Sequence, residues 1–415
     1  MLTLIFFLTV LIFSKPIISV KNFLVILICA SVVSSYIIAS SLQINDLTDI
    51  LIESFMILIL YLFIKNYSYY SRLDRIELNK SSINFSTITF WLGLASSVVL
   101  LINIYIVYKS FGLISSGLDI NAFKNEGEAQ DYFKAWVSGP ILSISHFLSP
   151  IGYICLPLYF YFLQEKSRRK SVVFFILSLN VPLHGLHALS RFDTISYILV
   201  FISFLIFCYS AIEKRIMRKI LIQLSILITI LVILLSIITT QRFSETKYYD
   251  DKRPAESLIQ DKTLFSTFHY FSQWHEYGRI TIREFDYDKL WYGKASTPIL
   301  SRILMPLGYE DPGILELRRE SLGWYGTKFN GLVSTLVYDF GFVFTLGLTL
   351  LFGYIIKRLA PKNGIIPLSK FVYFGLLINI PLMSFTNNIM AYLTFNLGII
   401  YTLILNLLLK ISSRD

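Results

Sequence analysis

The sequence predicts an all-α, polytopic membrane protein, and three observations lead to this prediction. Of the 415 residues, 55% are hydrophobic and only 15% are charged, whereas soluble domains carry about 25% charged residues. Apolar runs of about 20 residues, the length that crosses a hydrocarbon core, recur along the chain. The three cysteines lie inside such runs without metal-binding spacing, which argues against a disulfide framework.

Spanning helices are expected throughout the chain except in one long segment. We place eleven of them at residues 2–20, 22–41, 48–65, 87–108, 137–162, 172–189, 192–212, 220–240, 329–356, 370–387 and 389–409. The first run has no basic segment before it, so a cleavable signal is not expected. This division predicts a membrane bundle at 1–240, a large loop at 241–328 and a second membrane bundle at 329–415.

Basic residues gather in alternate connections between these helices. The groups are Lys65/Arg72/Arg75/Lys80, Lys166/Arg168/Arg169/Lys170, Lys214/Arg215/Arg218/Lys219 and Lys357/Arg358/Lys362. Since Lys and Arg in short connections stay on the cytoplasmic side, the N-terminus is predicted outside and the C-terminus inside. The net charge of +10 therefore reports membrane topology, and no nucleic-acid partner is expected.

Two hydrophilic loops fall on the external face, at 113–136 and 241–328. The larger loop has 13 Lys/Arg and 13 Asp/Glu, so it is densely charged but neutral. It is also rich in aromatic and aliphatic residues, which disordered segments lack. Long loops with this composition are usually functional, although a solvated loop without chemistry is the plainer alternative.

The stretch FHYFSQWHEYGR, residues 268–279, predicts an amphipathic helix inside the larger loop. At 100° per residue, His269, Gln273, Glu276 and Arg279 share one face, and aromatic side chains occupy the other. His275 lies at the border. We expect the aromatic face to lie at the headgroup interface and the polar face to be open to water, as either a catalytic face or a simple anchor.

A second external feature lies between the sixth and seventh spans. Ser190 and Asp193 have the S-x-x-D spacing of a capping box, which places a helix N-terminus there with Arg191 in its first turn. Free backbone N–H groups and a guanidinium together favour an anion such as phosphate. The apolar run before it contains His184 and His187, which are either functional or bonded to a neighbouring helix. His146, in the fifth span, is expected to be a satisfied histidine of the bundle.

Several familiar patterns carry no function in this sequence. Asp339-Phe340-Gly341 lies at the mouth of a span, and the kinase glycine-rich and catalytic loops are absent from the sequence. Asp286-Tyr287-Asp288 has the D-x-D form of metal-dependent glycosyltransferases, but two aspartates in so charged a loop occur easily by coincidence. Zinc, ATP and dinucleotide motifs are also absent from the sequence, so neither a metal nor a cofactor is predicted.

The order of spans and loop, together with the exit from the loop, resembles the bacterial O-antigen and oligosaccharide-repeat-unit polymerases, the Wzy family. The exit reads YGTKFNGLVSTLVYDFGFVFTLGLTLLFGYIIKR, residues 325–358. Some members of that family carry an R-x10-G pattern in external loops, and Arg302 and Gly313 have this spacing. In hydropathy, the resemblance covers most of the chain. In sequence motif, it covers only the exit segment and the external arginines.

The resemblance implies a metal-independent glycosyltransferase with a GT-C-like helical bundle in the bacterial inner membrane. Such enzymes move a growing glycan from undecaprenyl diphosphate to a hydroxyl of an incoming lipid-linked repeat unit, on the extracytoplasmic face. The partners implied are this lipid-linked oligosaccharide, the lipid bilayer and a chain-length regulator.

The reaction would need cations for the leaving diphosphate and a base for the acceptor hydroxyl. The arginines that we expect to bind diphosphate or glycan are Arg191, Arg253, Arg279 and Arg302. The catalytic residues that we expect are His275, His269 and Glu276.

Two other functions remain open at this stage, besides a purely structural scaffold. The O-antigen ligase shares the bundle, loop and donor, and differs in its acceptor. A flippase for lipid-linked oligosaccharides would show sequence halves, short loops and charged residues along a pathway. We find no internal repeat, and we expect the charges to avoid the spans, so the flippase ranks below the polymerase.

Overall fold

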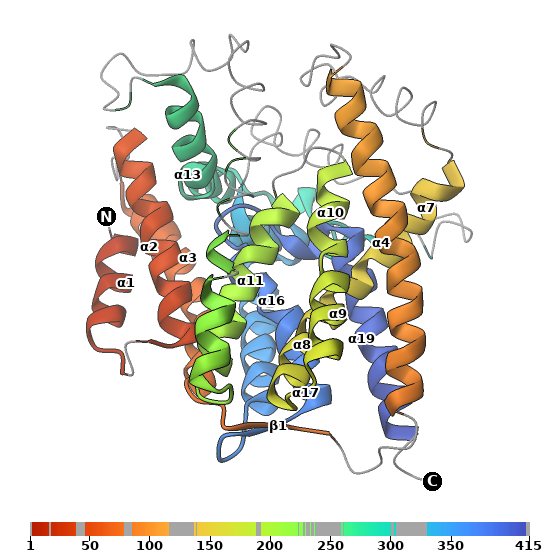
Figure 1. The fold of residues 1–415 in the computed structure, drawn as a ribbon. Coiled ribbons are helices and arrows are strands. Elements are labelled where there is room, and N and C mark those ends of the chain that lie inside the picture. The colour runs from red at the N-terminus through yellow and green to blue at the C-terminus, as the bar shows by residue number, and fades with distance from the viewer. Residues whose placement is uncertain are drawn as a thin grey trace. The chain divides into compact units, whose positions relative to one another are not determined.

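The computed structural model describes most of the chain. The residues that it describes are 2–15, 18–38, 46–78, 85–115, 137, 139–187, 192–222, 224–226, 229, 233, 236, 259, 261–299, 303 and 330–411. The chain divides into two compact units, each built from three stretches of sequence. The fold is predominantly helical, as the composition predicts (Figure 1).

The first unit comprises Met1–Ser71, Thr246–Ala360 and Ile378–Asn396. Its helices are α1 (Leu2–Ile12), α2 (Val20–Ile38), α3 (Leu47–Lys65), α13 (Lys262–Arg283), α16 (Gly331–Leu359) and α18 (Asn379–Leu382), with 3-10 turns η1 (Asn66–Tyr70), η4 (Tyr287–Lys289) and η7 (Ile389–Ala391). Helix α13, from the predicted loop, packs against α2, α3 and α16 (Figure 1). Part of the loop is therefore built into a membrane-type bundle.

The second unit comprises Arg72–Glu245, Pro361–Leu377 and Leu397–Asp415. Its elements are β1 (Arg75–Glu77), α4 (Phe85–Ser115), α7 (Gly139–Leu148), η2 (Ser149–Ile151), α8 (Gly152–Gln164), α9 (Arg168–Ser178), α10 (Asn180–His187), α11 (Phe192–Cys208), β2 (Ile365–Pro367), α17 (Leu368–Leu377) and most of α19 (Leu393–Ile411). Stacked phenylalanines, including Phe160 and Phe204 with ring centroids 5.1 Å apart, fill its core.

Five helical segments of the described residues are long and apolar enough to cross a membrane. They are Val20–Ile38, Leu47–Tyr70, Phe85–Gly112, Gly139–Gln164 and Gly331–Leu359, and four shorter apolar helices accompany them. A multi-pass membrane protein is thus supported, while the number of eleven spans stays a prediction. The first predicted span is helical only to Ile12, and the sixth is split between α9 and α10.

The two short strands join connections that the charge pattern places on the same side of the membrane. β1 follows α3 and pairs in parallel with β2, which follows α16, so that Ile76 lies opposite Ile366. The backbone N–H of Asp74 also donates to the carbonyl of Gly364 at 2.7 Å. Because strands pair only when their connections lie together, this agrees with a common side for the basic groups around Arg72 and Lys362.

Helix α16 is interrupted at Gly341, where φ is +71° and the helical geometry is lost. The carboxylate of Asp339, just before the break, is buried and accepts hydrogen bonds from the backbone of Ala295 at 3.0 Å and the hydroxyl of Ser296 at 2.5 Å. Asp339 therefore fastens the loop after α13 to α16. Our expectation that charged residues avoid the spans is wrong at this position.

Two glycines allow α13 and the start of α16 to approach closely. A Cβ at Gly278 would lie 2.8 Å from the backbone oxygen of Asn330, and Gly331 has a φ of +78° with Trp274 directly against it. A side chain at either position would collide with the neighbouring helix or strain the backbone. The contact thus requires glycine at both positions.

We expect Gly278→Ala to lower the free energy of unfolding by about 1–3 kcal/mol, because the backbone of Asn330 must move to make room. Gly347→Ala on α16 is the matched control, since a Cβ there meets nothing within 4 Å. Denaturant unfolding in detergent micelles would measure both variants. Equal stability of the two variants would contradict the close approach of α13 and α16.

Candidate functional site

Helix α13 is the element that carries most of the described candidate residues. The helix predicted over 268–279 is confirmed, and it extends over Lys262–Arg283. Asp261 caps its N-terminus by accepting from the backbone N–H of Leu264 at 2.7 Å. The sequence forms a helix here because its apolar and polar residues recur at helical spacing.

The polar side of α13 is mostly buried, which corrects our expectation that it faces water. His269, Gln273 and His275 are buried, and so is Trp274 on the aromatic side. The reason is that α2 supplies polar partners to the helix. Trp274 Nε1 donates to Ser31 Oγ at 3.1 Å, and Ser35 Oγ donates to the carbonyl of Ser272 at 3.1 Å. The segment is a packed helix in this structure, and its polar face is not open to water.

His275 lies against a buried carboxylate on α3. Its Nε2 is 3.7 Å from Oε1 of Glu53, and the two side chains are only 4% and 3% exposed. The same oxygen accepts hydrogen bonds from the backbone N–H of Thr3 at 3.0 Å and from its hydroxyl at 2.8 Å. Thr3 lies in the first turn of α1, where N–H groups have no partner within the helix. Three helices thus converge on one acid–base pair.

The arrangement favours one tautomer of His275. A proton on Nε2 would face the carboxylate of Glu53, which leaves the lone pair on Nδ1. Nδ1 is buried and has no hydrogen-bond partner among the described residues. A base that a second group orients, as Glu53 orients the His275 ring, is how enzymes activate a hydroxyl or a thiol.

The other two candidates for the base are placed differently. His269 is buried, stacks on Phe265 with centroids 5.8 Å apart, and its Nδ1 lies 2.9 Å from Nε2 of Gln273. The amide nitrogen of Gln273 can only donate, so Nδ1 of His269 is occupied as an acceptor. Glu276 is partly buried. His275 is the candidate whose carboxylate partner, Glu53, lies among the described residues.

The predicted arginines are only partly located. Arg279 lies on α13, one turn after His275, and is partly buried. Arg191, Arg253, Arg302 and Gly313 lie outside the described residues. Helix α11 does begin at Phe192 with Asp193 in its first turn, as the S-x-x-D spacing predicts.

The last turn of α13 is tied to the start of α3 by an ion-pair cluster. Arg283 contacts Asp46 at 2.7 Å and Asp49 at 3.3 Å. The backbone N–H of Asp49, which Asp46 caps, lowers the pKa of Asp46, and the Arg283 guanidinium lowers this pKa further. These contacts hold α13 along α3, so that His275 and Glu53 stay in register.

No protein-family profile, characterised protein or solved structure matches this chain. The function is therefore inferred from the residues themselves. In the part of the chain that the structure describes, three or more His, Cys, Asp or Glu side chains are nowhere grouped to hold a metal ion.

Glu53 is the residue that the sequence reasoning missed. It lies within the predicted span 48–65, where an ionisable side chain is costly and is by default a candidate functional residue. The signal was therefore present in ILIESFMILIL, residues 50–60. Our expectation that charges avoid the spans is wrong here too, as it is for Asp49.

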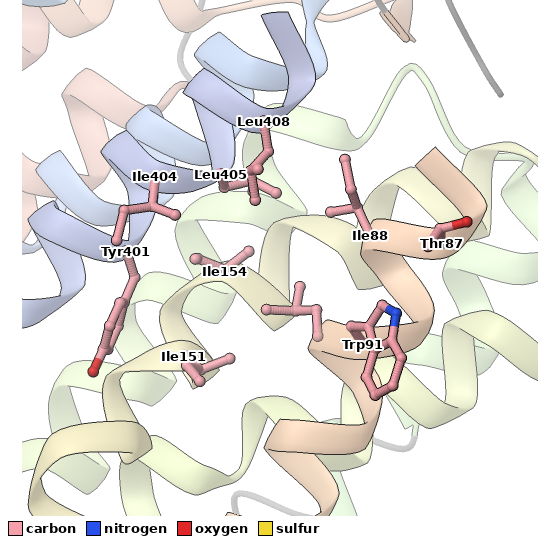
Figure 2. A pocket seen from close by; sticks show the side chains of 10 residues that line it. Thr87, Ile88, Trp91, Ile151, Ile154, Tyr401, Ile404, Leu405 and Leu408 are labelled. Atoms are coloured by element: carbon pink, nitrogen blue, oxygen red, sulfur yellow. The ribbon is translucent and has the colours of Figure 1, made fainter. Parts of the chain in front are cut away.

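The second unit contains an apolar groove with a volume of about 340 Å³. Its walls come from α4, the η2–α8 segment and α19 (Figure 2). The lining residues are Thr87, Ile88, Trp91, Leu92, Ile151, Ile154, Tyr401, Ile404, Leu405 and Leu408. A groove with this lining accepts a hydrocarbon chain far better than a polar ligand.

Proposed function

We propose that the protein is a membrane glycosyltransferase that polymerises a surface polysaccharide, in the manner of the O-antigen polymerases. The observation that carries the proposal is the buried pair of His275 and Glu53, where α13 packs on α3 and Thr3 of α1 donates to the same carboxylate. A base oriented by a carboxylate is what an acceptor hydroxyl needs before it can attack a glycosyl donor.

In the proposed reaction, the acceptor hydroxyl gives its proton to Nδ1 of His275 and its oxygen attacks the anomeric carbon of the growing glycan. The bond from that carbon to the phosphate oxygen breaks, and undecaprenyl diphosphate leaves with the bonding electrons. Glu53 stabilises the imidazolium that forms. The arginines predicted for the diphosphate, Arg279 on α13 among them, would stabilise the charge on the leaving group.

The charge pattern favours an extracytoplasmic active face. Glu53, the partner of the base, lies about two turns from the start of α3, while Lys65 and the basic residues after it mark the opposite end. The reaction would therefore occur at the outer face of the inner membrane, where the lipid-linked repeat unit is presented. The proposal includes the GT-C-like bundle of eleven spans, a chain-length regulator as partner, and no metal or cofactor.

The apolar groove between α4, α8 and α19 is consistent with a substrate on a polyprenyl carrier. A volume of about 340 Å³ holds a segment of a hydrocarbon chain, and its lining is almost wholly apolar. The groove alone would serve an ordinary membrane lipid equally well, so it supports the proposal without carrying it.

A lipid-linked oligosaccharide flippase is the second candidate, and one observation favours it. Three carboxylates are buried within spanning helices, those of Asp49, Glu53 and Asp339. Buried charges of this kind are typical of transport pathways. The ligase shares the chemistry proposed for His275 and differs in accepting the sugar of a lipid A core.

The proposal is tested by incubating the purified protein in detergent with an undecaprenyl-diphosphate repeat unit, without nucleotide sugar or metal. We expect a ladder of glycans on a gel. Transfer to a lipid A core acceptor with no ladder would identify a ligase. Movement of a labelled lipid-linked unit across liposomes with neither product would overturn the proposal in favour of the flippase.

A further inference from the structure

A cluster of imidazoles lies in the second unit, where side chains of α7, α10 and α11 meet. Nε2 of His184 is 2.7 Å from Nδ1 of His146, and Nδ1 of His184 is 3.8 Å from Oδ2 of Asp193. His184 and Asp193 are mostly buried, with 13% and 17% of their side chains exposed, whereas His146 is exposed. The three side chains form a chain that runs from a shielded carboxylate to an exposed imidazole. As expected of a histidine of the bundle, His146 is bonded to a neighbouring helix.

The surrounding sequence holds this cluster in place. A Cβ at Gly185 would lie 2.7 Å from Cβ of Asp193, so glycine is needed for the first turn of α11 to approach His184. On the inner side, Asn103 of α4 donates to Asn180 at 2.9 Å and accepts from Ser145 of α7 at 2.7 Å. This buried network fixes α7 relative to α10.

A third imidazole lies next to the row formed by Asp193, His184 and His146. The ring of His187 is 5.2 Å from that of His184, and its Nδ1 is 3.5 Å from Oγ of Ser145. Tyr153 on α8 also interacts electrostatically with Asp193. Polar side chains therefore surround Asp193, His184 and His146, although the helices that carry them are otherwise apolar.

The contacts determine where the protons lie in the neutral cluster. A carboxylate favours a proton on the nearer nitrogen of His184, its Nδ1, so that Nε2 of His184 becomes an acceptor. The 2.7 Å contact then requires the proton of His146 to be on Nδ1. Whatever else it contacts, Nε2 of His146 can then only accept a proton.

We propose that Asp193, His184 and His146 form an acid–base relay in which His146 takes a proton from a hydroxyl-bearing ligand at the exposed side of α7. The hydroxyl proton moves to Nε2 of His146, and the oxygen keeps the electron pair. The positive charge on His146 is stabilised as its Nδ1 proton shifts toward His184, whose Nδ1–H faces Asp193. In this relay His146 is the catalytic residue, and His184 and Asp193 are positioning residues. The site is separate from the pair on α13 and does not depend on glycan transfer.

Diethyl pyrocarbonate, which acylates unprotonated imidazole nitrogen, tests the relay in the full-length protein in detergent micelles. The chain has five histidines, and peptide mass spectrometry would give a rate for each. We expect His146 to react fastest in the wild type. Gly185→Ala and Asp193→Asn should each slow His146 by about tenfold or more, because the orienting carboxylate is displaced or neutralised.

Gly139→Ala at the start of α7 is the control and should leave the rate at His146 unchanged, since a Cβ there meets nothing within 4 Å. Unchanged rates at His269 and His275 would show that each variant is folded. Nitrogen NMR of histidine-labelled protein would locate the proton of His146 directly. A proton on Nε2, or a rate at His146 no greater than that of buried His187, would overturn the relay.

Discussion

Replacing His275 with Ala should lower the free energy of unfolding by about 3–5 kcal/mol, because it leaves the buried carboxylate of Glu53 without the imidazole that faces it. Glu53 would then still accept from the two donors of Thr3. Both side chains are almost fully shielded, so water cannot replace the lost interaction. Denaturant unfolding in detergent micelles measures the loss.

A double variant separates the structural role of this pair from its chemical role. Glu53→Leu with His275→Phe removes both polar groups and fills the same volume, and such replacements of buried pairs are often neutral or stabilising. We expect the double variant to regain most of the stability that His275→Ala loses. A double variant less stable than His275→Ala would show that Glu53 and His275 do not interact as described.

Trp274→Ala should cost about 3–5 kcal/mol of stability, because it empties the largest buried side-chain volume of α13. The ring is 1% exposed, and its Nε1 donates to Ser31 on α2. The loss should release α13 from α2 and α16, so the same variant should also abolish the proposed transfer. Thermal unfolding in micelles, followed by tryptophan fluorescence and helicity, measures the effect.

Two controls distinguish loss of packing from loss of the hydrogen bond. Ser31→Ala removes the acceptor alone and should cost only about 1–3 kcal/mol. Trp91→Ala on α4 removes an indole that is 60% exposed and should change stability by less than about 1 kcal/mol. Trp274→Ala and Trp91→Ala of equal stability would contradict the packing of α13.

The sequence predicts the helical class and one element of the candidate site well. Hydropathy and length locate helices such as α3 and α16 within a few residues of their observed ends, because a membrane span must satisfy its backbone internally. The amphipathic period predicts α13. These features depend on local sequence, and local sequence is what periodicity reports.

The surroundings of α13 could not be predicted in the same way. A helical period shows which residues share a face, but it does not show whether water or another helix covers that face. The polar groups that meet α13 or its partner Glu53 come from helices more than 200 residues earlier in the sequence, namely Ser31, Ser35 and Thr3. Only the folded structure brings these residues close to α13. Glu53 was predictable as an unusual residue in an apolar run, although its pairing with His275 was not.

The central claim, that His275 is the base of a glycan polymerase, is tested most directly by chain elongation with the stable double variant Glu53→Leu/His275→Phe. The single-turnover rate of ladder formation would be measured beside the wild type and Glu213→Gln, a control at an exposed ion pair with Lys166. We predict wild-type rates for Glu213→Gln and a loss of about 10²–10⁴-fold in the double variant, the usual contribution of general-base catalysis. A folded double variant that elongates the glycan at the wild-type rate would contradict the claim.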